Sequence, residues 1–153
     1  MKCRQTPRQW LVLDRSDSSA WRIVRRLPPG TGVLLLCHDL SKRERSAVVA
    51  KLRRIAGTRG LAMSDEAERR VARVHTMREL RRAHLAEVSL MFLSPVFPTA
   101  SHPDWQPLPR MRAAAMIRLA NAPVIALGGM SARRFRLVKP LGFQGWAGIG
   151  AWL

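Results

Sequence analysis

Acidic residues, cysteines and long apolar runs are all scarce in this sequence. Aspartate and glutamate together number 10 against 27 lysines and arginines, and there are two cysteines, at positions 3 and 37. Two cysteines are too few for a disulfide framework, and these two lack the spacing of a metal site. No apolar run approaches the ~18 residues that span a bilayer, and no signal-type apolar segment follows the basic N-terminus. We therefore expect a cytoplasmic protein that does not enter the membrane.

The remaining composition is that of an ordinary globular domain. The chain has 153 residues, of which 47% are apolar and 24% are charged, and these fractions are close to the average for folded domains. A domain of this size buries about two thirds of the surface of its unfolded chain, which is enough for a hydrophobic core. We expect one domain over residues 1–153, with no internal repeat and no linker.

The net charge of +17 points to ligands that carry phosphate. Nucleic acid, an acidic membrane and small phosphorylated molecules are the usual partners of a basic protein. Proteins that read nucleic acid gather their positive charge on one face and interleave aromatic residues, whereas the arginines here occur in every predicted helix. We interpret them as a solvated surface that binds nucleic acid only non-specifically, at low salt.

Short apolar segments alternate with helical patterns along the whole chain. The segments that are typical of strands are 9–13, 32–37, 61–64, 71–75, 89–93, 123–127 and 145–149. The predicted helices begin near Ser18 or Ser19, Asp39 or Ser41, Met77, Met111 and Ser131. Gly57 and Gly60 are predicted to end the second of them. This alternation predicts parallel strands in an α/β fold, and it fits both an open doubly wound sheet and a (β/α) barrel.

In either architecture, ligands bind at the carboxyl ends of the strands. Gly128-Gly129 leads from a predicted strand into the Ser131-capped helix, and Gly148-Ile149-Gly150 follows the last strand. Glycine turns of this kind expose backbone N–H groups that hold an anion, although glycine is also common in ordinary turns. The Pro-rich stretch 94–103 between two predicted elements offers hydroxyl and imidazole groups, and loops this long are often functional.

Three segments of the second half resemble the thiamine phosphate synthase/TenI family. Ser94-Pro95-Val96-Phe97-Pro98-Thr99 is followed by Ala126-Leu127-Gly128-Gly129-Met130 and then by Gly145-Trp146-Ala147-Gly148-Ile149. The family pattern runs GPVFPT-x-T-K, then an A-I-G-G turn, then G-V-A-V-V-S, in this order and at about this spacing. Val74-His75-Thr76-x-x-Glu79-Leu80 is similar to the family segment S-x-H-S-x-x-E-L. The resemblance covers roughly residues 71–153.

The resemblance implies a TIM-type barrel and a transferase of thiamine biosynthesis. Enzymes of this family couple hydroxymethylpyrimidine diphosphate to thiazole phosphate with Mg²⁺ and release pyrophosphate. By analogy, the substrate-binding residues here are Thr99, Ser101, Gly128, Gly129, Ile149, Gly150 and Ser64. The resemblance also implies Asp65 as the magnesium ligand. Two candidate catalytic residues depart from the family pattern. His102 replaces the lysine after T-x-T and could act as an acid or base, and Arg73 replaces the serine of the S-x-H segment and could contact phosphate.

Other positions depart from the family pattern. The diphosphate grip Q-x-R-x-K is replaced by Leu34, Leu36 and His38, and neither leucine can donate a hydrogen bond. Only six residues separate Ser64 from Val71, so a helix, a strand and a second helix are missing there. We therefore expect a shortened barrel of about seven strands that is incompletely closed, with a bare edge that a homodimer would cover.

Three functions remain open at this point. The first is a thiamine phosphate synthase with an altered diphosphate site. The second is a catalytically impaired relative that binds thiazole phosphate or another phosphorylated heterocycle. The third is a basic module that binds nucleic acid.

Overall fold

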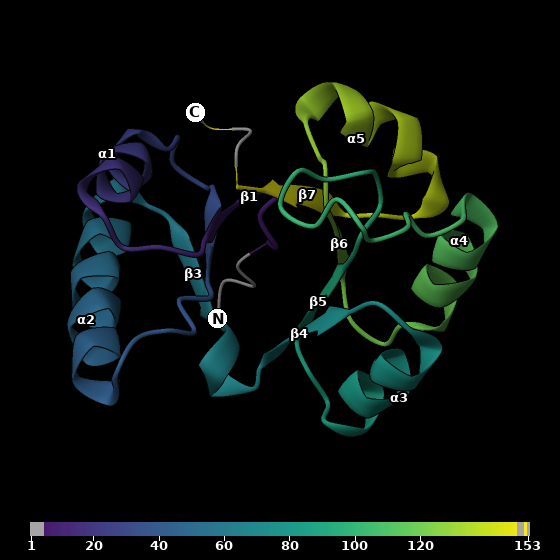
Figure 1. Ribbon diagram of the computed structural model, residues 1–153, viewed down its shortest axis with the longest axis horizontal. Helices are drawn as coiled ribbons and strands as arrows, with labels where there is room; N and C mark the ends of the chain where they lie inside the picture. Colours follow the sequence, from purple (N-terminus) through teal and green to yellow (C-terminus); the bar gives the residue numbers. More distant parts are fainter. Residues whose placement is uncertain (1–4, 150–151, 153) are drawn as a thin grey trace.

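The computed structural model describes residues 5–149 and Trp152, and this part of the chain forms a ring of parallel strands surrounded by helices (Figure 1). The strands are β1 (Gln9–Leu13), β2 (Gly32–Leu35), β3 (Ala62–Asp65), β4 (Val71–Val74), β5 (Leu90–Leu93), β6 (Val124–Leu127) and β7 (Gly145–Gly148). The helices are α1 (Ser18–Arg26), α2 (Lys42–Arg59), α3 (Met77–Leu85), α4 (Arg110–Leu119) and α5 (Ala132–Val138), with short 3₁₀ turns η1 (Glu66–Glu68) and η2 (Lys139–Leu141).

The seven strands form a nearly closed TIM-type barrel with one gap. Their order is β3-β2-β1-β7-β6-β5-β4, and every neighbouring pair is parallel. The two edge strands, β3 and β4, are consecutive in the chain and are joined through η1 alone. A parallel crossover ordinarily contains a helix and a dozen or more residues. The predicted seven-stranded, gapped barrel is therefore confirmed, and its gap lies where the sequence is short.

The interior of the barrel is a compact apolar cluster. Its members are Trp10, Val12, Leu34, Leu36, Val71, Leu90, Phe92, Ile125 and Ala147. The Trp10 and Phe92 rings meet edge to face, with their centroids 5.4 Å apart. Gly32 lies opposite Trp10 in the β1–β2 register, where an added Cβ would come within 2.3 Å of the indole. Glycine at this position therefore leaves the room that the large ring needs.

Two further clusters lie between the strands and the helices. One packs α1 and α2 against β1 and β2, and the other packs α3, α4 and α5 against β4 to β7. Figure 1 shows the same division, with α1 and α2 on one side of the ring and α3, α4 and α5 on the other. Because one face of each strand meets the interior and the other meets a helix, apolar residues occupy both faces of most strands.

Helix boundaries mostly follow the predicted caps, with two corrections. Ser41 begins α2 through a reciprocal capping box with Glu44, as the sequence indicates. The cap of α1 is Asp17, not Ser18 or Ser19, because the Asp17 carboxylate accepts from the backbone N–H of Ala20 at 2.9 Å. Gly57 lies inside α2, and only Gly60, with φ +67°, ends it. A helical glycine costs about 1 kcal/mol, which is too little to end a helix that packs well.

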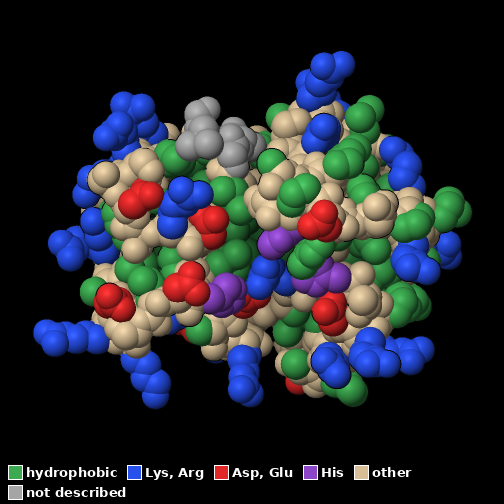
Figure 2. All heavy atoms as spheres, in the orientation of Figure 1, with side chains coloured by type: hydrophobic (Ala, Val, Ile, Leu, Met, Phe, Trp, Pro, Cys, Tyr) green, Lys and Arg blue, Asp and Glu red, His purple; other side chains and the backbone are tan. Residues whose placement is uncertain are grey.

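The surface is basic around the periphery of the ring. In Figure 2 most lysine and arginine side chains project outward around the rim. The histidine and several acidic side chains lie nearer the middle of this face, with a few basic side chains among them. None of the helices in the described ranges combines the length and the apolar character that crossing a bilayer would require.

Candidate functional site

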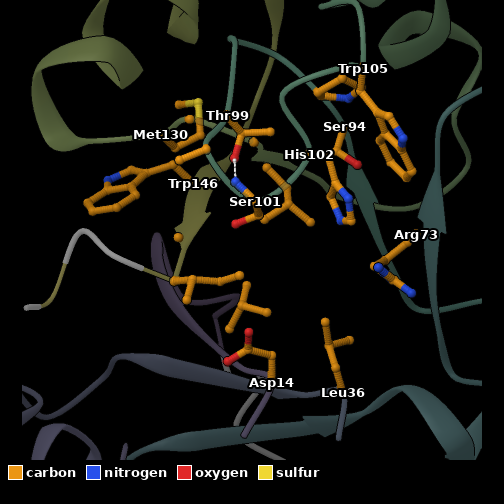
Figure 3. Close-up of a pocket in the computed structure, with 18 of the residues that line it drawn as sticks. Asp14, Leu36, Arg73, Ser94, Thr99, Ser101, His102, Trp105, Met130 and Trp146 are labelled. Atoms are coloured by element: carbon orange, nitrogen blue, oxygen red, sulfur yellow. Dashed lines mark hydrogen bonds between the residues drawn. The ribbon is translucent and has the colours of Figure 1, made fainter. Parts of the chain in front are cut away.

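A cavity of about 1210 Å³ opens at the carboxyl ends of the barrel strands. Figure 3 shows its open centre between Asp14 and Leu36 on one side and Thr99, Ser101 and His102 on the other, with Arg73 at the edge. The cavity is lined by the predicted residues Arg73, Thr99, Ser101, His102, Gly128, Gly129 and Ile149. Ser64 and Asp65 are not part of the lining, and Gly150 lies outside the described residues.

The Gly128–Gly129 turn forms one wall of the cavity. Its φ angles are +96° and +58°, which favour glycine strongly. A Cβ at Gly129 would lie 2.2 Å from the carbonyl oxygen of Pro98, and one at Gly128 would lie 2.9 Å from Cα of Pro95. Among the turn, loop and cap hydrogen bonds of residues 5–149, none is donated by the N–H of Gly129. Glycine at both positions therefore lets the segment 95–98 pack directly on the turn, and the Gly129 N–H is left for another acceptor.

The loop between β5 and α4 is tied to this turn by backbone hydrogen bonds. The Val96 N–H donates to the Leu127 carbonyl at 3.0 Å, and the Phe97 N–H donates to the Gly128 carbonyl at 3.1 Å. These bonds fix the start of the loop, so Thr99 and Ser101 come to lie over the cavity, where the Ser101 N–H donates to the Thr99 hydroxyl at 3.3 Å (Figure 3). The hydroxyl groups and the glycine turn thus line the same part of the site.

Arg134 adds a cation to this wall. It lies in the first turn of α5 and lines the cavity. Its Nη1 donates to the Gly129 carbonyl at 2.6 Å, and its guanidinium lies 5.2 Å from the centre of the Phe97 ring. A guanidinium with spare N–H groups is a common partner of phosphate. The glycine turn, the two hydroxyls and Arg134 together can bind a phosphate group.

Arg73 points into the barrel from β4 beside the gap. It pairs in register with Phe92, a member of the interior cluster. Its Nε donates to Glu66 Oε1 at 2.5 Å, and its Nη2 lies 3.3 Å from His38 Nε2. The other Glu66 oxygen lies 3.1 Å from His38. Arg73 of β4, Glu66 of η1 and His38, which follows β2, therefore meet at the gap between β3 and β4, at the edge of the cavity.

Asp65 lies on the outer face of the barrel. It pairs in register with Leu35, whose side chain packs toward the helices. Its carboxylate is 7% exposed, forms a salt bridge with Arg45 and accepts from the Ala67 N–H at 2.9 Å. Arg45 Nη1 also donates to the carbonyl groups of Leu36 and Cys37. A carboxylate held by a guanidinium and an amide outside the cavity does not fit a magnesium site there.

The described part of the chain contains no group of three or more histidine, cysteine, aspartate or glutamate side chains arranged to hold a metal ion. The surroundings of Asp65 do not fit the magnesium that the family resemblance implies there, because Arg45 and the Ala67 N–H already bind its carboxylate. The role of Asp65 as a metal ligand stays a prediction.

The wall on the side of β1 and β2 carries no cation among its lining residues. Leu36 lies at the position where the family pattern has an arginine, and Asp14 and Asp39 lie near it. Cys37 also lies here, but burial raises the pKa of its thiol, so the group stays protonated. The half of the cavity that would hold a diphosphate in the family is apolar and acidic in this chain.

Sequence patterns do not predict the positions of three residues in and beside the site. Glu66 and Arg134 line up with Arg73 and the glycine turn only after the chain folds. A local signal existed for Glu66, because residues 65–68 are the densest acidic run of a basic chain. Trp105 lines the cavity as well, stacked on His102 with ring centroids 4.3 Å apart, and no sequence pattern marked it.

Comparisons with known proteins agree with this architecture. The family model described as thiamine monophosphate synthase, TMP-TENI, matches residues 71–152. A protein of Aquifex aeolicus named "Putative thiamine-phosphate synthase 2" is 32% identical over 79 residues, which are 52% of this chain and 42% of the relative. The matched region therefore spans less than half of that relative.

Solved structures extend the likeness to the whole fold. A thiamine phosphate pyrophosphorylase from Pyrococcus furiosus superposes with a TM-score of 0.76 over 97% of this chain and 88% of its own, at 16% identity. A mutant of FabK from Thermotoga maritima gives a TM-score of 0.51 over 88% of this chain and 47% of its own, also at 16% identity. With the family model matching more than half of its residues, the chain belongs to the thiamine monophosphate synthase (TMP-TENI) family.

Proposed function

We propose that this protein binds a phosphorylated heterocycle, such as thiazole phosphate, in the barrel cavity and holds the phosphate at the Gly128–Gly129 turn. The observation that carries the proposal is the turn itself, which lines the cavity and whose Gly129 N–H donates none of the turn, loop and cap hydrogen bonds of the described residues. Arg134 contributes positive charge beside the turn. Thr99 and Ser101 face the ligand from the loop, in agreement with the family resemblance.

In this proposal the ligand is a phosphomonoester, not a diphosphate, and its binding needs no magnesium. The wall near β1 and β2 presents the apolar Leu36, which offers an anion no hydrogen bond, and the carboxylates of Asp14 and Asp39, which would repel a second anionic group. Asp65, the expected metal ligand, is held by Arg45 outside the cavity.

The coupling of hydroxymethylpyrimidine diphosphate to thiazole phosphate is the second candidate. Arg73 is the observation that favours it, because this cation lies at the edge of the cavity (Figure 3). Its guanidinium already binds Glu66, so a diphosphate would have to compete with a carboxylate. Binding of the phosphomonoester is therefore the first proposal, and the coupling reaction is tested on the same protein.

Calorimetric titration with thiazole phosphate, with and without Mg²⁺, tests the binding. We expect saturable binding that is independent of Mg²⁺, is lost for the unphosphorylated thiazole alcohol and is abolished in Gly129→Val. Gly57→Ala is the matched control, since a Cβ at Gly57 meets nothing within 4 Å. Equal affinity in Gly129→Val and the unchanged protein would overturn the proposal.

Incubation with both family substrates and Mg²⁺ tests the coupling. Thiamine phosphate that forms with the unchanged protein and disappears in Arg73→Met would establish the second candidate. Binding of thiazole phosphate without formation of thiamine phosphate would support the binding function and overturn the second candidate.

A further inference from the structure

His75 carries an unpartnered nitrogen in the wall of the cavity. It follows β4 and lines the cavity together with Arg73 and Ser94. Its Nε2 is buried and has no hydrogen-bond partner among the described residues. A buried polar atom without a partner costs free energy, about 1–3 kcal/mol, so this nitrogen calls for an explanation.

Glu79 fixes the orientation of the His75 ring. One oxygen of its carboxylate, Oε2, lies 3.1 Å from His75 Nδ1 and accepts from the backbone N–H groups of His75 and Thr76. Burial alone would raise the pKa of Glu79, but the hydrogen bonds that its carboxylate accepts from His75 and Thr76 outweigh it and hold that pKa below its usual value. The carboxylate is therefore ionised at neutral pH.

An ionised carboxylate only accepts hydrogen bonds, so it selects the tautomer of the neutral imidazole. The proton is placed on Nδ1, where it is donated to Glu79, and the lone pair is placed on Nε2. Nε2 of His75 is therefore a hydrogen-bond acceptor that has no donor among the described residues. The capping box between Thr76 and Glu79 starts α3, so a stable element of the fold holds this arrangement in place.

Aromatic rings surround the acceptor. The Trp105 indole meets the His75 ring edge to face, with centroids 5.0 Å apart at 88°, and its other neighbour is the stacked His102 ring. Trp105 belongs to the loop between β5 and α4 and is 43% exposed, so it can shift without opening the core. A flat ring that reaches this wall would find aromatic surface and one fixed acceptor.

We propose that His75 determines the specificity of the cavity by accepting a hydrogen bond, at Nε2, from an amino group on the ring of the bound phosphomonoester. This inference rests on the proposed function, because the phosphate at the Gly128–Gly129 turn orients the ring. The ligand class is then a heteroaromatic phosphomonoester that carries an N–H donor. Glu79 acts as a positioning residue, since it fixes the tautomer and does not touch the ligand.

Matched ligands that differ by one amino group test the proposal. Pyrimidin-5-ylmethyl phosphate is compared with its 2-amino and 4-amino derivatives by calorimetry at pH 8, where these rings and the free imidazole are uncharged. We expect at least one amino derivative to bind about tenfold more tightly than the parent, as one hydrogen bond to a buried acceptor predicts. In His75→Phe, which keeps a ring against Trp105, this advantage disappears.

Two further variants separate specificity from folding. His84→Phe, at an exposed position of the same helix, should keep the tenfold preference. Glu79→Gln can still serve the capping box but no longer imposes the tautomer, so it should reduce the preference, and nitrogen NMR of the His75 ring should show the proton no longer confined to Nδ1.

The outcomes distinguish this proposal from the function on which it rests. No preference for either amino derivative, or a preference that survives in His75→Phe, would overturn the role of His75 while the phosphate site stands. Failure of the parent, both derivatives and thiazole phosphate to bind the unchanged protein would overturn both.

Discussion

The Asp65 carboxylate binds the Arg45 guanidinium across the outer face of the barrel, between β3 and α2. Both groups are largely buried, at 7% and 20% exposure. This pairing shows that the carboxylate stabilises the packing of a helix on the sheet, at the position where the family resemblance implied a metal ligand.

Asp65→Ala should lower the free energy of unfolding by about 2 kcal/mol, because it leaves the Arg45 charge largely buried without its partner. Urea unfolding measures this loss. Arg45→Met combined with Asp65→Ala should recover part of it, since no unpaired charge then remains. An Asp65→Ala protein as stable as the unchanged one would contradict the pairing.

Magnesium should leave the melting temperature of the protein unchanged. A ligand that binds only the folded state raises that temperature, and Asp65 is not available for a metal in this arrangement. Thermal melts of the unchanged protein and of Asp65→Asn, with and without about 10 mM MgCl₂, measure the effect. A shift that Asp65→Asn removes would restore Asp65 as a metal ligand.

Glu66→Gln should strengthen the binding of pyrophosphate by roughly fivefold, a gain of about 1 kcal/mol. Glu66 Oε1 accepts a hydrogen bond from Arg73 Nε at 2.5 Å. The substitution removes the negative charge of Glu66, so the Arg73 guanidinium becomes available to an anion. Calorimetry with pyrophosphate measures the change. Glu68→Gln in the same 3₁₀ turn is the control, because Glu68 binds Arg53 at the surface; an equal gain there would point to net charge alone.

Gly32→Ala should destabilise the barrel by about 1–3 kcal/mol, the usual cost of overpacking a core. The added Cβ would lie 2.3 Å from the Trp10 ring, which is 2% exposed and packs on Phe92. Near-ultraviolet circular dichroism should report the displaced indole, and urea unfolding the lost stability. Gly57→Ala should instead stabilise α2 by about 0.5–1 kcal/mol.

Glu79→Ala should destabilise the protein by about 1 kcal/mol at pH 7, because it removes one half of the capping box of α3. The pKa of Glu79 is lowered in the folded state, so its contribution is present above the unfolded value near 4.3 and is lost as the pH falls through the folded value.

The difference in melting temperature between the unchanged protein and Glu79→Ala should therefore shrink between pH 5 and about pH 3. Asp39→Ala, which removes an exposed carboxylate, serves as the control. A difference that stays constant over this range would show that the charge of Glu79 contributes nothing.

Much of the fold and part of the site follow from local patterns. Residues 32–35 and 90–93 are apolar on both faces, as buried parallel strands require, and Ser41 and Thr76 start helices through capping boxes. Gly128 and Gly129 mark a turn at a strand end, where parallel sheets bind ligands. The short segment between Ser64 and Val71 predicted the gap in the barrel. Each of these signals depends on neighbouring residues alone.

The tertiary structure decided which neighbouring side chains face the cavity. Successive residues of a strand point to opposite faces, so the outward direction of Asp65 and the inward direction of Arg73 depend on strand registers that the sequence leaves open. The pairing of Arg73 with Glu66, the position of Arg134 beside Gly129, and the contact of Trp105 with His75 join segments through the folded barrel. The sequence by itself determined the order of elements and the glycine turn, because these are local; the composition of the cavity is non-local, and only the packed barrel decided it.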